Sequence, residues 1–540
     1  MRIALRGFVG LSAVLVFILP VSGADPANKN AAITARLTAT IDRELSADWS
    51  ARQITPAADA DDAEFLRRVS LDLIGRIPRV AEVRAFLADT TPDKRARLVE
   101  KLMTMPAFAS HLASTTRTDW LPQSLTNQQY IYTGSQFEEW LRKRIAENQP
   151  INETVRTVLS AKVGPRLRGG IPADARTPDD FALVAFFQAN EVKPENLAAT
   201  VSRAFMGVKL ECAQCHDHPF NASLTRDQFW EFAAFFGEFA ALPPVSPSFV
   251  GALQPQFLVN RLTIPNTNRT LVAAFPNGAS PKWTLDRTPR TELVDWLVSP
   301  SNPYFARNAT NRLWAHFFGI GIVDPVDETS EANPPSHPRL LDALATALVE
   351  SGYDQRAMIR AIVASKAYSR SSQLSHPSQA DARRFARMPV RGLTANQIYD
   401  SFLAATGQRD LTPRSQPFVD PRSDVGRGVF RTQFADTGKT TETQTSILQA
   451  LMLMNGKAVA DQTSLERSEV LAAVVDAPFL DIPKQVETLF LAAMTRKPTP
   501  EEAERFTSYV ERGGASGNKS QALADLFWVL LNSTEFLFNH

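Results

Sequence analysis

The sequence lacks an excess of charge of either sign. It has 58 lysines and arginines against 57 aspartates and glutamates in 540 residues, a formal net charge of +1. Because domains that bind nucleic acid are typically strongly basic, this balance argues against a nucleic-acid partner. No stretch after residue 24 is long and apolar enough to cross a membrane. We also find no internal repeat and no long low-complexity segment, so a repeat architecture is not expected.

Several common catalytic motifs are also missing. The sequence contains no G-x-S-x-G, no H-E-x-x-H and no calcium-binding loop. Gly169-Gly170 lacks the strand, turn and helix that surround a phosphate-binding loop. Acidic pairs such as Glu138-Glu139 are adjacent, so they face different directions on a helix and are typical of a solvated surface. These absences leave one conspicuous chemical motif.

That motif contains the only two cysteines of the chain, in Cys212-Ala213-Gln214-Cys215-His216. C-x-x-C-H is the signature of covalent attachment of haem c. Two thiols at this spacing can each bond a vinyl group of the porphyrin, and the next residue can place an imidazole on the iron. We therefore predict that Cys212 and Cys215 are thioether anchors and that His216 is an axial iron ligand.

The residues around the motif suggest how it is placed. Leu197, Val201, Phe205, Val208, Cys212 and Cys215 follow steps of four and three residues. This spacing predicts one helix whose core-facing side also carries both sulfur atoms. Downstream, the aromatic run Phe229, Trp230, Phe232, Phe235 and Phe236 is expected to wall an apolar cofactor pocket.

Other interpretations of the motif stay open. Cys212, Cys215, His216 and His218 could bind zinc, although two histidines so close together would strain a tetrahedral site. A thiol–disulfide redox pair is a further alternative, but the strand-then-helix frame of such proteins is missing. A purely structural disulfide is the simplest alternative, and it would leave His216 unexplained.

A sixth haem ligand has few candidates among seven histidines and nine methionines. His316 is the best, because it lies on the apolar stripe of a predicted helix. The competing interpretation, a core histidine with one hydrogen bond, has the higher prior. His218 is too close to His216 to reach the other face of the same haem. His337 is expected at a helix start, and Met206 is expected to fill core space.

The first 24 residues predict a signal peptide. Arg2 and Arg6 form a basic start, residues 8–21 an apolar middle, and Ser22-Gly23-Ala24 a cleavage site. A periplasmic or secreted location follows, and it agrees with haem c because this haem is attached outside the cytoplasm in bacteria.

The remaining sequence predicts a mainly α, multi-helical protein of two domains with a small Pro-rich, strand-containing insert between them. The expected helices span 30–48, 61–73, 135–148, 151–160, 337–350, 355–365, 394–406, 445–456, 483–496, 500–512 and 520–532, with further helix starts at Arg79, Thr91, Arg290 and Asn302. The insert contains the alternating run 258–264. Residues 162–180 and 414–440 are expected to be surface loops.

Several stretches resemble a known family. PENLAATVSRAFMGVKLECAQCHDHPFN, QFWEFAAFF and the upstream FLRRVSLDLIGRIP resemble the planctomycete cytochrome-like domain. NRLWAHFFGIGIV, NPPSHPRLLDALA, TQTSILQALMLMN and LLNSTEFLF resemble the companion domain of unknown function that usually follows it. The resemblance implies a cytochrome-like domain at 25–240, the insert at 241–288 and the companion domain at 289–540. Many members carry a second cytochrome c domain, but this chain has no second C-x-x-C-H.

We therefore predict an exported c-type haem protein with one haem per chain, a periplasmic electron-transfer or redox component whose redox partner is unknown. The sequence leaves open whether it is an enzyme. The alternative function is a non-redox binding protein, associated with extracellular glycan, in which the C-x-x-C-H motif holds zinc or a structural disulfide.

Overall fold

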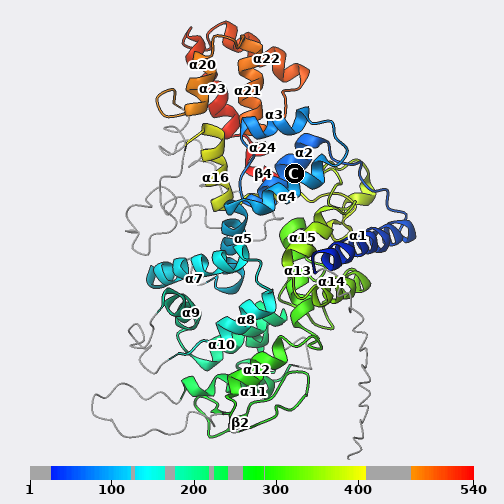
Figure 1. Ribbon diagram of the computed structural model, residues 1–540, viewed down its shortest axis with the longest axis vertical. Coiled ribbons are helices and arrows are strands. Elements are labelled where there is room, and N and C mark those ends of the chain that lie inside the picture. The colour runs from blue at the N-terminus through cyan, green and yellow to red at the C-terminus, as the bar shows by residue number, and fades with distance from the viewer. Residues whose placement is uncertain are drawn as a thin grey trace, which may run out of the picture.

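The computed structural model of the chain describes residues 26–122, 128–163, 177–217, 224–240, 260–284, 286–408 and 464–540. Within these ranges the protein is mainly α-helical, as predicted, and it has two small two-stranded sheets. In Figure 1 the C-terminal helices lie at one end of the long axis and the β1–β2 hairpin at the other. None of the described helices is long and apolar enough to span a membrane.

The helices of the N-terminal half are α1 (Pro26–Ala51), α2 (Asp62–Ile74), α3 (Val80–Ala88), α4 (Lys94–Thr104), α5 (Pro106–Trp120), α7 (Gln128–Ala146), α8 (Ile151–Leu159), α9 (Pro178–Ala189), α10 (Pro194–Val201), the π-helical turn η1 (Ser202–Met206), the 3₁₀ turn η2 (Leu210–Ala213), α11 (Arg226–Ala233) and the 3₁₀ turn η3 (Ala234–Phe239). The C-terminal half has α12 (Pro289–Leu297), α13 (Phe305–Phe318), α14 (Pro338–Glu350), α15 (Gln355–Val363), the short turns η5 (Pro377–Gln379) and η6 (Ala382–Arg384), α16 (Ala395–Thr406), α20 (Glu469–Asp476), α21 (Ile482–Met494), α22 (Pro500–Glu511), α23 (Lys519–Leu531) and α24 (Thr534–Leu537).

The predicted insert does contain strands. β1 (Arg261–Thr263) pairs with β2 (Thr270–Val272) in antiparallel register, with Leu262 opposite Leu271. A second small sheet joins β3 (Arg391–Gly392) to β4 (Phe538–Asn539). The expected helix over 445–456 and the expected loop over 414–440 lie outside the described residues.

The buried apolar side chains form two clusters that do not follow the boundary drawn from the sequence. The larger cluster extends from α1 to Met388, also contains Leu491 of α21, and includes residues on both sides of the insert, because α1 packs on α14 and α15. The smaller cluster is built by α16 and α20–α24, and it also contains Leu71 of α2 and Ile77, which precedes α3. The residues on the two sides of the insert therefore share one core.

Hydrogen bonds of nearby side chains and glycine conformations determine where the helices begin and end. Asp61 caps α2 by accepting from the Glu64 backbone N–H, and Gly75 ends the helix at φ +70°. The predicted start of α4 at Thr91 is wrong. The helix begins at Lys94, because Thr91 instead donates its hydroxyl to Asp89 at 2.7 Å. Helices α5, α9 and α11 were not predicted as separate elements.

The expectation that the chain has no internal repeat also needs correction. The α2–α3 and α21–α22 units share the pattern R-x-P-x-x-x-E, starting at Arg76 and at Arg496. In both units the arginine donates to the carbonyl of the next residue and binds the glutamate with both ends of its guanidinium group. That glutamate, Glu82 or Glu502, also accepts a backbone N–H at the helix start. The repeat is one helical hairpin long.

A buried polar network joins α2 to the end of the chain. Asp72, 2 % exposed, forms an ion pair with Arg391 in which both carboxylate oxygens lie 3.0 Å from Nη2. Tyr368 Oη and Asn539 Nδ2 each donate to the same carboxylate at 2.8 Å. One turn away, the buried guanidinium group of Arg67 donates to backbone carbonyls of Ala493, Glu535 and Phe536. In Figure 1 the C-terminus and β4 accordingly lie beside α2.

Candidate functional site

The backbone that leads to the C-x-x-C-H motif does not continue as one helix. α10 ends at Val201, a π-helical turn follows, and Gly207 takes φ +70°. Such left-handed geometry is natural for glycine and stops a helix. Val208 then forms a β-bridge with Glu328, after which the chain enters the 3₁₀ turn η2. The predicted single helix through the cysteines is therefore wrong.

The direction of the two sulfur atoms follows from this turn. A 3₁₀ helix has three residues per turn, so residues three apart share a face. Leu210 and Ala213 take the inner face and are 1 % exposed. Cys212 lies in this turn and Cys215 lies two residues beyond its end; both are exposed and are not bonded to each other. The prediction that both thiols face the core is thus wrong, and the thiols instead open toward solvent.

The turn is held by neighbouring elements. The buried Trp230 of α11 donates its indole N–H to the Gln214 carbonyl at 3.0 Å. On the other side, Lys209 forms ion pairs with Glu328 at 2.6 Å and Asp327 at 3.4 Å. The Thr329 backbone N–H also donates to the carbonyl just before Val208, at 2.9 Å. The motif is therefore fixed between α11 and the segment 326–329, which lies beyond the insert.

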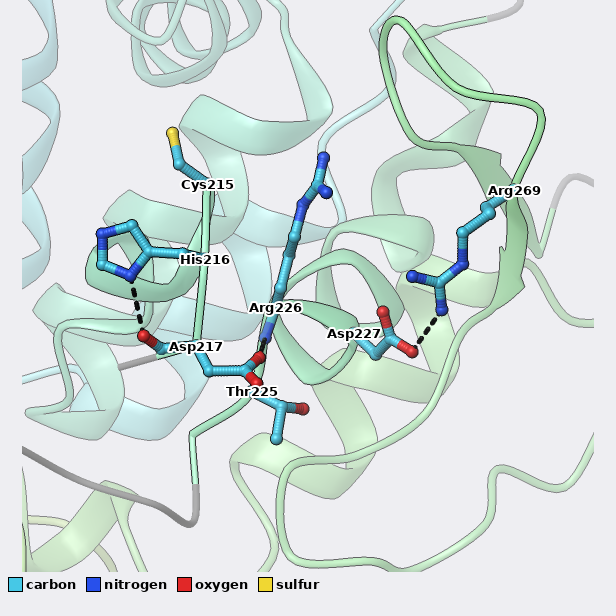
Figure 2. A pocket seen from close by; sticks show the side chains of 7 residues that line it. All are labelled: Cys215, His216, Asp217, Thr225, Arg226, Asp227 and Arg269. Atoms are coloured by element: carbon cyan, nitrogen blue, oxygen red, sulfur yellow. Dashed lines mark hydrogen bonds and ion pairs between the residues drawn. The ribbon is translucent and has the colours of Figure 1, made fainter. Parts of the chain in front are cut away.

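His216 is exposed, and one of its nitrogen atoms is already engaged. Nδ1 lies 2.7 Å from the Asp217 carbonyl oxygen. A carbonyl can only accept, so Nδ1 carries the proton and Nε2 of the neutral ring presents its lone pair. The Asp217 side chain in turn accepts from the Arg226 backbone N–H at 2.8 Å, which ties the loop to the first turn of α11. Figure 2 shows both contacts.

An open pocket of about 520 Å³ lies beside the motif, and its walls are polar. Cys215 and His216 line it together with Asp217, Thr225, Arg226, Asp227 and Arg269 (Figure 2). Arg269, just before β2, forms an ion pair with Asp227 at 2.5 Å. The Nε atom of Arg226 is buried without a hydrogen-bond partner in the described part of the chain. Arg226 and Arg269 are the two arginines among the residues that line this pocket.

The aromatic run does not wall this pocket. Phe229, Trp230, Phe232, Phe235 and Phe236 are each at most 3 % exposed and pack into the larger core. Phe235, for example, stacks on Phe275 next to β2 at a centroid distance of 5.0 Å. These side chains instead form the core on which α11 and the β1–β2 hairpin pack. None of them is among the residues that line the pocket, so the expectation of an aromatic wall is wrong.

The electrostatics of the motif differ from those of a thiol redox catalyst. Although Cys212 is exposed, partial desolvation by the adjacent chain raises the pKa of its thiol, and the neighbouring Glu211 carboxylate raises it further. Burial also raises the pKa of Glu211. Thiol–disulfide catalysts instead lower the pKa of the attacking cysteine to obtain a thiolate. The surroundings of Cys212 therefore do not favour the thiol–disulfide alternative.

His316, the predicted sixth ligand, lies in a different place. It is on α13, its Nε2 donates to the Asp72 carbonyl oxygen at 2.8 Å, and it lines a different cavity from the pocket of His216. The structure therefore does not bring His316 and His216 into one pocket. His337 stands at the start of α14, as predicted, 3.5 Å from Asp48, and Met206 is buried in the core. His218 lies outside the described residues.

No group of three or more histidine, cysteine, aspartate or glutamate side chains that could hold a metal ion occurs within the described ranges. The zinc alternative needs His218 in addition to the three described residues of the motif. Sequence reasoning missed Asp217, Arg226 and Arg269. The capping box that starts at Thr225 would have placed Arg226 in the first turn of a helix, whereas no sequence signal points to Arg269.

Comparison with known families assigns most of the chain. Residues 40–241 match PSCyt2, a protein family of unknown function (DUF1549), and residues 289–441 match PSD1, a protein family of unknown function (DUF1553). The chain is a PSCyt2–PSD1 protein. The order of the two matches confirms the predicted resemblance to the planctomycete cytochrome-like domain followed by its companion. No curated protein and no solved structure matches the PSCyt2–PSD1 protein.

Proposed function

We propose that the PSCyt2–PSD1 protein is an exported c-type haem protein and that its haem transfers electrons. Cys212 and Cys215 form the thioether bonds, and His216 binds the iron through Nε2. The observation that carries this proposal is the hydrogen bond from Nδ1 of His216 to the Asp217 carbonyl. Histidine ligands of metals usually donate their other N–H to such an acceptor, which fixes the ring and makes the ligating nitrogen more basic.

The residues at the motif fit a covalently bound haem. The two exposed, unbonded thiols lie in and just after a turn that is fixed on both sides. Each can add its S–H across a vinyl group, with sulfur bonding one carbon and hydrogen the other, so nothing leaves. Arg226 lines the pocket, and its guanidinium group would pair with a haem propionate there. Charge-assisted bonds of this kind are among the stronger ones in proteins.

The position of the motif favours electron transfer. A haem iron supplies reversible one-electron chemistry, and His216 and the local polarity set its potential. The pocket is open to solvent, so a redox partner could approach closely. Export, expected from residues 1–24, would bring the chain to the compartment where haem c is attached in bacteria.

The test is production of the full chain in a bacterium with a cytochrome maturation system. We expect sharp reduced absorption bands, haem retained in denaturing gels and a mass increased by one haem. The double variant Cys212→Ala/Cys215→Ala should lose all three. Gln214→Ala changes the same turn without touching a thiol or the imidazole, so this control should keep its haem.

A colourless protein whose mass equals that of the polypeptide, made beside a control cytochrome that matures normally, would refute the proposal. One zinc ion per chain in that protein would instead support the alternative of a non-redox, glycan-associated binding protein.

A further inference from the structure

Glu211 stands immediately before the thioether anchor Cys212, in the turn η2. Its side chain as a whole is 28 % exposed, so the carboxyl group can exchange a proton with water. One carboxylate oxygen, Oε2, is nevertheless buried and has no hydrogen-bond partner in the described part of the chain. A buried oxygen without a donor stabilises a carboxylate poorly, because the charged form loses hydration without compensation. Glu211 is therefore a carboxyl group that readily binds a proton.

The nearby cationic groups compensate this carboxylate only weakly. Arg203 of η1 is its ion-pair partner, but the N–O distance is 4.0 Å, which is too long for a hydrogen bond. Lys209 instead binds Glu328 at 2.6 Å and Asp327 at 3.4 Å. Burial raises the pKa of Glu211, and Asp327 adds to that rise. The backbone N–H of Glu211, Arg203 and Lys209 act against the rise without reversing it.

The Glu211 carboxylate and the C-x-x-C-H motif influence each other electrostatically. After partial desolvation, this carboxylate is the next cause of the raised pKa of the Cys212 thiol, so its charge acts at the sulfur atom. Two helices, α10 and α11, also pack on η2. Their charged side chains are Glu195, Arg226, Asp227 and Glu231. A pH effect at the motif must therefore be assigned to Glu211 by substitution.

We propose that Glu211 binds a proton when the haem attached at Cys212 and Cys215 is reduced. The inference rests on the proposed function and adds a proton to the electron that is transferred. Glu211 takes one proton from water, and its carboxylate becomes a carboxylic acid. At the same time one electron arrives from the redox partner and converts ferric to ferrous iron. The electron makes the motif more negative by one charge, which the proton at Glu211 offsets.

Proton binding and reduction are linked reciprocally in this scheme. We expect reduction to raise the proton affinity of Glu211 about tenfold, within the usual range for coupled sites. Protonation must then raise the affinity of the haem for an electron by the same factor. For a one-electron couple this factor corresponds to about 59 mV. The midpoint potential should therefore fall by that amount as the pH rises through the range in which Glu211 loses its proton.

The test is the midpoint potential of the haem-loaded full chain, measured by spectroelectrochemical titration from acidic to neutral pH. Glu211→Gln keeps the size of the side chain but cannot bind the proton, so the fall attributed to Glu211 should disappear. Glu328→Gln is the matched control, because this carboxylate is paired with Lys209 and its side chain is 44 % exposed. The control should keep the fall. The haem propionates are common to all of these proteins and cancel in the comparison.

Asp327→Asn provides a second variant that leaves Glu211 in place. It removes a negative charge that raises the pKa of Glu211, so the fall in potential should keep its size and move to lower pH. Infrared difference spectra of the unchanged protein provide a further readout. On reduction within the pH range of the fall, the C=O band of a protonated carboxylic acid should grow, and Glu211→Gln should remove this growth.

The outcomes separate this inference from the proposed function. Haem-loaded protein whose potential falls equally with and without Glu211→Gln overturns the inference alone, as does a fall that Glu328→Gln abolishes equally. If the Glu211→Gln chain takes up no haem, an unchanged position of the fall in Asp327→Asn overturns the inference. A full chain that binds no haem under maturing conditions refutes the proposed function and this inference together.

Discussion

The Asp72–Arg391 ion pair gives the sharpest test of how this fold is held together. Asp72→Asn keeps the shape of the side chain, so no cavity forms, but it removes the negative charge that faces the buried guanidinium group. Asp72 and Arg391 side chains are 2 % and 8 % exposed. Removing one partner of a buried ion pair costs about 3–5 kcal/mol, because the other charge stays buried and uncompensated. We expect the free energy of unfolding to fall by that amount.

The neighbours of Asp72 should not rescue the variant. The Tyr368 hydroxyl also donates to this carboxylate. Burial raises the pKa of Tyr368 well above its usual value, and Asp72 adds to that rise, so the hydroxyl stays protonated and cannot supply the missing charge. Asn539 is neutral as well. The Arg391 guanidinium group would therefore be left without a counter-charge on this carboxylate side.

The assay is urea unfolding followed by far-UV circular dichroism at neutral pH. Glu100→Gln is the control, since both oxygens of Glu100 also bind one arginine, Arg360, at 2.7 and 2.9 Å, but both side chains are at least one-third exposed. An exposed pair contributes about 0–1 kcal/mol. In a double-mutant cycle, adding Arg391→Gln to Asp72→Asn should cost less than Arg391→Gln alone. Equal losses for Asp72→Asn and Glu100→Gln would refute the reasoning.

Three further predictions follow from single positions. Gly207→Ala places a Cβ 2.8 Å from a side-chain oxygen of α13, whereas Gly352→Ala at φ +71° meets nothing within 4 Å. Thermal melting should therefore show a loss of about 1 kcal/mol for Gly352→Ala and a clearly larger loss for Gly207→Ala. Burial, helped by nearby Arg67, lowers the pKa of His540 from 6.5 to about 4. As the pH falls, the unfolded chain therefore binds this proton before the folded chain does, and the free energy of unfolding should decrease by roughly 3 kcal/mol between pH 6.5 and about 4. His540→Gln should remove this part of the pH dependence, measured by urea unfolding. An unchanged pH profile in the variant would contradict the prediction. Finally, each of the single variants Cys212→Ala and Cys215→Ala should keep its haem through the remaining thioether, with reduced bands at longer wavelength because one vinyl group stays conjugated. Bands identical to those of the unchanged protein would count against two thioethers.

Much of the helical framework was predictable because its signals are local. The Gly75 break after α2 and the Thr499 capping box of α22 depend on residues a few positions apart, and both are confirmed. Thr91 shows the limit of such reasoning. Its hydroxyl could either accept a backbone N–H at the start of α4 or donate to Asp89, and the sequence alone does not decide between these two hydrogen bonds.

The path through the motif could not be predicted from periodicity. The apolar spacing is correct up to Val208, which is 6 % exposed. It fails at the cysteines because Gly207 reverses the backbone and Val208 pairs with Glu328, a residue 120 positions away. The shared core of the two family regions could not be predicted either, because a contact between distant segments, such as α1 with α14, does not depend on local residue spacing.

The buried guanidinium group of Arg67 can be satisfied only after almost the whole chain has been synthesised. Its partner carbonyl at Ala493 lies 426 residues further along the chain. At translation rates of about 5–20 residues per second, α2 waits roughly 20 to 90 s for that partner to be synthesised. A polypeptide that stops at residue 288 would leave this guanidinium group without its acceptors and α1 without α14 and α15. We therefore expect that neither half folds by itself, and that expression of either half alone gives an aggregation-prone product.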